Sequence, residues 1–384
     1  MSNKKVIWLY PKLEKWMGGT RYVFECCKLL NKQFDLTVVC QKGDNLVLDK
    51  FDEEKIKYVN LQSLSFSDLK FWFFYRFTLS KDRKKLDDII TDDAIIISGM
   101  YPMNLLAVGY PNKHLQIIYE PFAFFYDDSF LKSFGFPAYF FFKIVKQFFS
   151  RADIKATQKS DAALVLSEFE ANQVKRIYKK DSQVIYEGVD ISFFYPRNTD
   201  AYEAKYKGYF PIMHSTGFDS FKGTDLLVNS LVKLKSIIPN YKLLITYTRE
   251  NTEKLNNYKE YILHNNLVDN VEFVGLLPYE QLPILYSFAK FYIEVGKNRS
   301  MSLSNKEALA CGTPVIRGND SFEEITDGYN GILVNPDSVD DLVEAINIYQ
   351  TDPGKYNKIK LNCVKSISDR FTWEAVTKKI VNNF

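Results

Sequence analysis

An alternation of short apolar runs and amphipathic stretches begins twice along this chain, and the second beginning constrains the fold most. In the first half the short runs are rich in β-branched and aliphatic residues, which is typical of buried parallel strands at 6–10, 36–40, 94–98, 116–119 and 163–166. Around 198–208 the apolar periodicity lapses into Asp, Lys, Asn and Tyr, and then it restarts. The sequence therefore predicts two doubly wound α/β domains in tandem, with ligands bound in the cleft between them.

The alternation of strand and helix patterns that restarts after 208 continues to about residue 366. It predicts strands at 212–216, 242–246, 271–274, 291–295 and 314–317, and helices at 225–238, 252–265, 279–289, 305–310, 342–350 and 352–366. In the last of these helices, Asp352 is the expected N-cap and Pro353 lies in the first turn. A length of 384 residues suits two domains of this kind.

Composition excludes several classes of protein. The formal net charge is +3, which lacks the basic excess typical of a protein whose main partner is nucleic acid. The five cysteines have no metal-ligand spacing, and we expect them to be buried free thiols in a reducing cytosol. The chain offers no signal-peptide core and no uncharged apolar stretch of about 18 residues. We therefore expect a cytoplasmic protein, either soluble or peripheral on the inner face of the membrane.

Aromatic residues make up 16% of the chain, and two segments interleave them with bases. Residues 69–85 and 139–149 both have helical patterns, with aromatic stripes beside Lys and Arg. Such helices can lie in a membrane interface. The alternative is that the aromatic side chains pack into the core and the bases are ordinary solvated charges. The sequence leaves both interpretations open.

Two loops that follow predicted strands carry residues suited to anion binding. Gly18 and Gly19 precede the first helix, where glycines let the backbone approach a ligand and helix amides favour an anion; a plain turn is the alternative. Lys222 comes just before Gly223 and the expected N-cap Thr224. Its ammonium could reach a diphosphate lying across the helix N-terminus, and a solvated lysine is the alternative.

The most informative stretch is 299–314, in which a polar loop of small residues enters a short helix. Glu307 lies about one turn into that helix and could accept hydrogen bonds from a polyhydroxylated ligand such as ribose. The sequence Gly312-Thr313-Pro314 then ends the helix and leads into the next strand. The alternative is an ordinary capped helix with a solvated Glu307.

This stretch, ending in Ala-Cys-Gly-Thr-Pro, resembles the signature of glycosyltransferase family 4. Further landmarks agree in order and spacing over essentially the whole chain: Gly18-Gly19, Tyr119-Glu120-Pro121 with Tyr126-Asp127, and the segments 186–190, 271–275, 327–331 and 371–374. The resemblance implies an α/β GT-B fold, with two Rossmann-like domains facing each other across a deep cleft. It places an acceptor domain at 1–203, a donor domain at 204–366, and a last helix over about 367–384 that packs back on the first.

The resemblance implies a retaining hexosyltransferase that uses a nucleoside diphosphate sugar, without a cofactor or a metal. Its acceptor would be a glycan or a lipid-linked molecule of polysaccharide biosynthesis. Lys222 would neutralise the donor diphosphate, Glu307 would bind the ribose, and Arg299 and Tyr119 complete the catalytic set. Glu120 is the candidate acceptor-binding residue. The remaining donor-binding positions are Gly18, Gly19, Gly217, Gly223, Gly275, Leu277, Met301, Ser302, Leu303 and Ser304.

Three polar positions depart from the family pattern. Tyr119 stands at the usual histidine, Gly217 at the arginine beside the diphosphate, and Arg299 at the first glutamate of the pair. One hypothesis couples the last two, because Gly217 removes a positive charge and Arg299 brings one into the same pocket. The alternatives are a non-catalytic partner of another transferase and a nucleotide-sugar epimerase. The epimerase would need acid–base groups in the cleft, where only His214 of the three histidines is expected.

Overall fold

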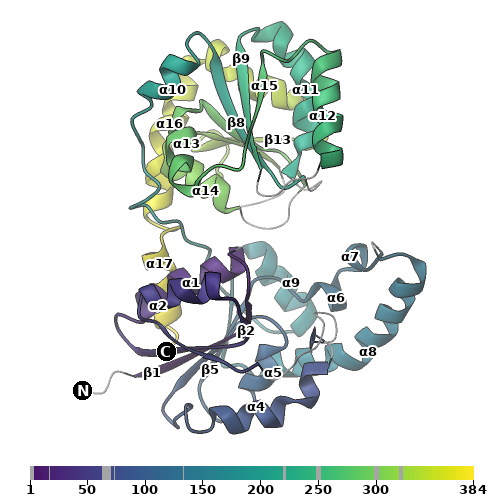
Figure 1. Cartoon of the computed structure of the whole chain (residues 1–384), viewed down its shortest axis with the longest axis vertical. Coiled ribbons are helices and arrows are strands. Elements are labelled where there is room, and N and C mark those ends of the chain that lie inside the picture. Colours follow the sequence, from purple (N-terminus) through teal and green to yellow (C-terminus); the bar gives the residue numbers. More distant parts are fainter. Residues whose placement is uncertain are drawn as a thin grey trace. The chain divides into compact units, whose positions relative to one another are not determined.

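A computed structural model shows that the chain forms two compact units. It describes residues 4–16, 18–62, 71–72, 74–132, 134–218, 222–247, 252–297, 302–319 and 323–384. One unit combines Met1–Glu187 with Trp373–Phe384, and the other is Gly188–Thr372. We call them the N-terminal unit and the C-terminal unit (Figure 1).

The N-terminal unit is built on a parallel sheet of seven strands in the order β3-β2-β1-β4-β5-β6-β7. The strands are β1 (Lys5–Leu13), β2 (Asp35–Gly43), β3 (Lys57–Asn60), β4 (Ile95–Ser98), β5 (His114–Ile118), β6 (Ala162–Val165) and β7 (Gln183–Val184). The chain runs outward from β1 to β3 and then returns to β4 on the other side of β1. The strand order therefore reverses between β1 and β4.

Helices connect these strands, and the helix at the end of the sequence also belongs to this unit. They are α1 (Gly18–Leu30), α2 (Asn45–Glu53), the 3-10 helix η1 (Tyr75–Phe77), α4 (Leu79–Leu86), α5 (Met103–Ala107), α6 (Ala123–Tyr126), α7 (Asp128–Lys132), α8 (Phe136–Lys159), α9 (Glu168–Tyr178) and α17 (Trp373–Val381). Helix α17 packs on α1, with the rings of Tyr22 and Trp373 5.4 Å apart. Phe384 meets Phe34 beyond the end of α1, at a centroid distance of 5.0 Å.

The C-terminal unit repeats the plan with six parallel strands in the order β10-β9-β8-β11-β12-β13. The strands are β8 (Phe210–Thr216), β9 (Tyr241–Tyr247), β10 (Val271–Gly275), β11 (Phe291–Glu294), β12 (Val315–Gly318) and β13 (Gly331–Val334). The helices are α10 (Asp200–Lys205), α11 (Thr224–Ile237), α12 (Thr252–His264), the 3-10 helix η3 (Tyr279–Gln281), α13 (Leu282–Phe288), α14 (Leu303–Ala310), α15 (Val339–Thr351) and α16 (Pro353–Ser368). Here the strand order reverses between β8 and β11.

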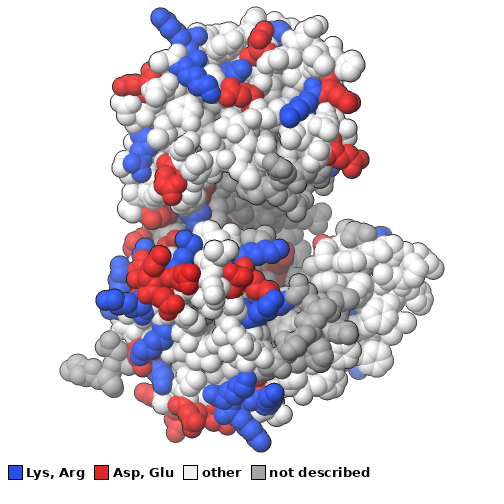
Figure 2. Space-filling model, viewed as in Figure 1, with Lys and Arg blue, Asp and Glu red and all other residues white. Residues whose placement is uncertain are grey.

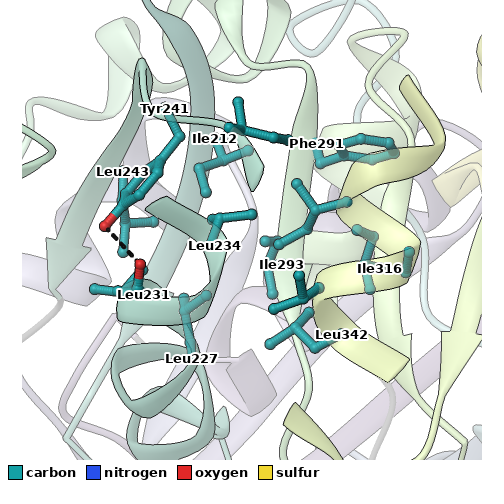
Figure 3. Close-up of a cluster of buried hydrophobic side chains, with 14 of the residues drawn as sticks. Ile212, Leu227, Leu231, Leu234, Tyr241, Leu243, Phe291, Ile293, Ile316 and Leu342 are labelled. Atoms are coloured by element: carbon teal, nitrogen blue, oxygen red, sulfur yellow. Dashed lines mark hydrogen bonds between the residues drawn. The ribbon is translucent and has the colours of Figure 1, made fainter. Parts of the chain in front are cut away.

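Apolar side chains from strands and helices of the C-terminal unit meet in one core (Figure 3). Strand residues such as Ile212, Leu243 and Ile293 are fully buried. They pack against α11, whose Leu227, Leu231 and Leu234 recur every three or four residues along one face. The Tyr241 hydroxyl is also buried, and it donates to the Leu231 carbonyl oxygen at 3.4 Å. The periodicity of the sequence therefore corresponds to real core faces.

The two α/β sheets predicted from the sequence are confirmed, and several local details can be compared. Asp352 is the N-cap of α16, and its side chain accepts from the Lys355 amide at 2.9 Å, as expected. The expected N-cap Thr224 is wrong, because Gly223 takes that position with φ 76° and Thr224 is the first helical residue.

The observed division at 187/188 lies upstream of the boundary placed at 203/204. The segment after 187 packs with the C-terminal unit, since Tyr202 of α10 lies against Phe288 of α13 with ring centroids 5.5 Å apart. The end of the C-terminal unit, at Thr372, likewise falls six residues beyond the boundary at 366, because α16 continues to Ser368 and α17 begins at Trp373. Polar, aperiodic sequence marks a linker less accurately than packing does.

The five cysteines are buried free thiols, as predicted. In the part of the chain that the structure describes, no helix is both long enough and apolar enough to cross a bilayer.

Candidate functional site

Charged side chains gather in the C-terminal unit at the point where the strand order reverses. In a parallel sheet this reversal opens a crevice at the carboxyl ends of the two strands that flank it, here β8 and β11. Lys222 follows β8 and directly precedes the Gly223 cap of α11, and Glu294 is the last residue of β11. Arg317 lies beside Glu294 in β12, because the two residues are register partners of these neighbouring strands.

Glu294 is the centre of this cluster and has no exposed surface. Its Oε2 accepts from Lys222 Nζ at 2.7 Å and from Ser302 Oγ at 2.9 Å, while its Oε1 accepts from Arg317 Nη1 at 2.7 Å. Burial disfavours the charged carboxylate, but the Lys222 and Arg317 cations outweigh that effect and lower the pKa of Glu294 to about 2. The carboxylate is therefore ionised at neutral pH.

Arg317 is 1% exposed and has a second carboxylate nearby. Its Nε lies 3.8 Å from Glu324 Oε1, and the same oxygen accepts from Asn305 Nδ2 at 3.3 Å. The four charged side chains Lys222, Glu294, Arg317 and Glu324 thus carry two positive and two negative charges. Among the described residues, no group of three or more His, Cys, Asp or Glu side chains could hold a metal ion.

Two helices begin beside this cluster, and in neither does the N-cap residue itself cap the first amides with its side chain. The N-cap of α11 is Gly223, which has no side chain to accept from the first amides. The N-cap of α14 is Ser302. Its hydroxyl donates a hydrogen bond to Glu294 and makes no capping hydrogen bond. Helix starts carry unsatisfied N–H groups and a partial positive charge. Together with Lys222, which is one-fifth exposed, they form a place suited to an anion such as a phosphate.

Gly223 is required by the close approach of α11 to β11. A Cβ atom at this position would lie 2.3 Å from the Gly296 backbone nitrogen and 2.5 Å from the Val295 carbonyl carbon. The positive φ of Gly223 also disfavours any other residue. This glycine therefore brings the Lys222 loop against the end of β11.

Glu307 lies one turn into α14, as the sequence predicts, and it is 4% exposed rather than solvated. Its Oε2 accepts from the Tyr286 hydroxyl of α13 at 3.2 Å. Glu307 is thus held by α13, whereas Lys222 is held by β11.

The other predicted donor-binding residues of this unit lie along the same carboxyl edge. Gly217 follows β8, and Gly275 ends β10 with φ 88°, followed by the half-buried Leu277. Ser302 and Leu303 begin α14. Arg299 and Met301 lie outside the described residues, and so does the hypothesis that Arg299 compensates for Gly217.

The predicted residues of the N-terminal unit gather at the carboxyl edge of its own sheet. Gly18 and Gly19 form the first turn of α1, so the helix begins where a glycine loop is expected. A Cβ atom on Gly19 would lie 2.5 Å from the Tyr10 hydroxyl oxygen. Tyr119 and the exposed Glu120 follow β5.

Tyr119 is turned into the unit. Its ring packs edge-on against Tyr10 and Tyr22, with centroids 6.2 and 5.2 Å away. Its hydroxyl is buried, with no hydrogen-bond partner among the described residues. The hydroxyl of Tyr119 is thus directed into the packing of the unit.

Sequence reasoning missed Glu294, Arg317 and Glu324. The signal available was the presence of a charged residue at the end of an apolar strand, in Phe-Tyr-Ile-Glu and in Val-Ile-Arg-Gly. Such residues are almost never fully buried unless they are paired. The pairing partners could not be identified, because they are distant in sequence.

His214 and His114 are both buried, at 0% and 3% exposure. Burial lowers the pKa of each to about 4. His214 Nδ1 is hydrogen-bonded to the Ile293 carbonyl oxygen at 2.7 Å, and its Nε2 lies 2.9 Å from Thr224 Oγ1. His214 is therefore a neutral structural link between β8, β11 and the start of α11.

Comparison with known proteins agrees with this geometry. The sequence model of the family described as "Glycosyl transferases group 1" matches residues 199–365. The chain is 25% identical over 221 residues to an uncharacterized glycosyltransferase of Methanocaldococcus jannaschii, covering 57% of this chain and 58% of the relative. A probable sucrose-phosphate synthase of Thermosipho melanesiensis is 25% identical over 205 residues, which is 52% of this chain and 46% of the relative. The chain thus spans about half of the length of these relatives.

Solved structures match over the whole chain at lower identity. A glycosyltransferase of Rickettsia africae is 19% identical with a TM-score of 0.75, and the match covers 100% of this chain and 98% of the other. HepE of Anabaena, solved in complex with UDP, is 15% identical with a TM-score of 0.78, covering 98% of each chain. The two Rossmann-like α/β units thus have the fold of GT-B glycosyltransferases, and residues 199–365 match the glycosyl transferases group 1 family.

Proposed function

We propose that this protein is a metal-independent, retaining glycosyltransferase. It moves a hexose-type sugar from a nucleoside diphosphate sugar to a glycan or a lipid-linked acceptor. The observation that carries the proposal is that Lys222 lies beside the starts of α11 and α14, whose N-cap side chains make no capping hydrogen bond. The printed names of relatives support it, since they include a mannosylfructose-phosphate synthase of Agrobacterium fabrum and an O-antigen chain mannosyltransferase B of Escherichia coli.

In this proposal the diphosphate lies across the helix starts at the β8–β11 crevice. Lys222 and the first amides of α11 and α14 stabilise the negative charge that develops as the sugar departs. Glu307 receives the ribose hydroxyls one turn further along α14. The bond from the anomeric carbon to the diphosphate oxygen breaks, and the electron pair leaves with the diphosphate. The acceptor oxygen bonds to the same face of the sugar, and its proton goes to the departing phosphate.

The acceptor is proposed to bind the N-terminal unit, where Glu120 is exposed beside the end of β5. The epimerase alternative loses support, because it needs titratable groups that reach the sugar and the nearby His214 is buried beneath the loop. The non-catalytic alternative rests on the departures from the family pattern at Tyr119, Gly217 and Arg299, and the experiment below tests it.

The N-terminal unit also carries a surface that suits membrane contact, on α8. Of the two aromatic-basic segments, the first contributes to the core, because Phe71 and Tyr75 are buried. In contrast, α8 exposes a row of apolar side chains over its first half: Phe136, Phe140, Phe141, Ile144 and Phe148. On the face shown in Figure 2, the region of α7 and α8 shows almost no charged side chains.

The second half of α8 exposes bases instead, at Arg151, Lys155 and Lys159. Its one acidic residue, Asp153, is 1% exposed and accepts from Asn104 Nδ2 at 2.7 Å inside the unit. An apolar face followed by bases fits the boundary between acyl chains and anionic headgroups. We therefore propose that α8 binds the cytoplasmic surface of an anionic membrane, where a lipid-linked acceptor would be found.

The donor site is tested by a thermal-shift measurement with UDP, GDP, ADP and TDP in the presence of EDTA. One nucleotide at about 100 times its Kd should stabilise the protein by about 2.7 kcal/mol. Lys222→Ala should remove most of the shift, and Lys233→Ala, an exposed lysine on the same α11 that pairs with Asp340, should not change it. Arg299→Ala should match Lys222→Ala if Arg299 compensates for Gly217. The absence of any shift would favour the non-catalytic alternative.

A further inference from the structure

The Glu294 carboxylate is paired more extensively than a structural ion pair requires. Arg317 alone, 2.7 Å away in the adjacent strand, would neutralise it. The second oxygen nevertheless accepts from Lys222 at 2.7 Å and from Ser302 at 2.9 Å. Lys222 directly precedes the N-cap of α11, and Ser302 is itself the N-cap of α14. Glu294 therefore links the residue before α11 to the N-cap residue of α14.

The contact to Lys222 restricts where its ammonium can lie. An ammonium group has three N–H bonds on a flexible four-carbon stem, which loses rotamer entropy when it is ordered by a ligand. One N–H is directed to Glu294 at 2.7 Å and a second to Ser302 Oγ at 3.5 Å, and the side chain remains 20% exposed. The ordering cost is thus met before a ligand arrives, and the ammonium is held near the start of α11.

The contact to Ser302 keeps the start of α14 open to a ligand. A serine at the N-cap normally accepts from the amide of the second or third helical residue. Here the Ser302 hydroxyl donates a hydrogen bond to Glu294, and the capping hydrogen bond is not made. Without Glu294 the hydroxyl could rotate to cap α14, and it would then compete with a phosphate for the same amides.

We propose that Glu294 is a positioning residue of the donor site, which orients Lys222 and withholds Ser302 from its own helix so that Lys222 and the first amides of α14 can bind a diphosphate. This inference rests on the proposed function. It makes a prediction opposite to simple electrostatics. Removing a buried negative charge next to the site should strengthen the binding of an anion, whereas removing a positioning residue should weaken it.

The test is calorimetric titration of the full chain with UDP, or with whichever nucleoside diphosphate gives the largest thermal shift. Glu294→Gln should weaken binding about tenfold, although it removes a negative charge. Glu294→Asp keeps the charge but is one methylene shorter, so it should also weaken binding. A double-mutant cycle with Lys222→Ala should show that the Gln substitution costs less, about threefold, once Lys222 is absent, because only the contact to Ser302 is then lost.

The matched control is Glu272→Gln, on β10 of the same sheet. Glu272 also pairs with a lysine, Lys205, at 3.0 Å, but it lies away from the β8–β11 crevice. This variant should bind the nucleotide as wild type does. Melting of the ligand-free variants shows whether each is folded, and Glu294→Asp, which keeps the partner of Arg317 charged, serves if Glu294→Gln unfolds.

Three outcomes would overturn the proposal. Tighter binding by Glu294→Gln would mean that electrostatics governs the site. An equal loss in the presence and absence of Lys222 would mean that Glu294 supports the fold and does not act through the lysine. No nucleotide binding by the wild-type chain would overturn the donor site itself, and with it the role of Glu294. The first two outcomes leave the proposed function intact.

Discussion

At the scale of single residues, burial decides the chemistry of the titratable groups. Glu294 stays ionised because two cations face it, whereas His214 stays neutral because burial disfavours its charged form and lowers its pKa. Both side chains link β11 to the start of α11. His214 makes this link through the Ile293 carbonyl oxygen and Thr224 Oγ1.

His214 should make the C-terminal unit less stable in mild acid. Its pKa of about 4 in the folded state lies below the ordinary value of 6.5, so the unfolded chain binds the proton first as pH falls. The stabilisation is complete above pH 6.5 and is lost between pH 6.5 and pH 4. From pH 7 to pH 5 the stability of wild type should fall by about 2 kcal/mol more than that of His214→Gln.

Guanidinium denaturation of both proteins at the two pH values measures this difference. His114 in the N-terminal unit, whose pKa is also lowered to about 4, is present in both proteins and cancels. Equal pH dependence in wild type and variant would contradict the prediction.

At the scale of elements, α8 is unusual because apolar residues cover more than one of its faces. Phe142 and Ala156 face the core of the N-terminal unit, together with Phe125 and Leu131. Phe141, next to Phe142, is 58% exposed, and Phe148 is 68% exposed. A helix of a protein surrounded only by water normally places polar residues there.

We expect Phe141→Ser with Phe148→Ser to weaken binding to vesicles of phosphatidylglycerol and phosphatidylcholine at least about tenfold, because each buried aromatic contributes about 1.5–3 kcal/mol. Cosedimentation measures the bound fraction, and raising the salt concentration should reduce it as the contribution of the bases is screened.

The control is Leu361→Ser on α16, which removes an apolar side chain that is 81% exposed in the other unit. It should bind as wild type does. Equal binding by the α8 variant, or no binding of wild type to anionic vesicles, would remove the membrane proposal. If the chain forms a concentration-dependent dimer and the α8 substitutions dissociate it, this face binds a second copy of the chain.

At the scale of the whole molecule, the N-terminal unit is built from two segments that are not consecutive in the sequence. Residues 188–372 form the C-terminal unit, but the last twelve residues belong to the N-terminal one. Trp373, at 3% exposure, packs on Tyr22 in the first helix of the chain. The stability of the N-terminal unit therefore depends on α17, which follows the whole C-terminal unit in the sequence.

Trp373→Ala should destabilise the N-terminal unit by about 3–5 kcal/mol, the usual cost of removing a buried aromatic side chain. Hydrogen exchange measures this cost separately for each unit. The amides of α1 should lose protection, whereas those of α11, in the core of the other unit, should keep theirs. Equal loss in both helices would show that the two units unfold together.

The sequence by itself determined the elements and their alternation. Periodicity, caps and strand composition act between neighbours in the chain, so the two sheets, the N-cap Asp352 and the placement of Lys222 and Glu307 near helix starts could all be predicted. The resemblance to a known family added the GT-B fold, which the solved structures confirm.

Only the tertiary structure decided which side chains meet. Lys222 and Glu294 are 72 residues apart, and Arg317 lies 23 residues beyond Glu294, so no local pattern connects them. The burial of single side chains could not be predicted either. Tyr119 and Phe141 are both aromatic residues in plausible functional positions, yet the hydroxyl of Tyr119 is buried and the ring of Phe141 is exposed. Pairing and burial depend on how helices pack on the sheets, and that packing is a property of the whole fold.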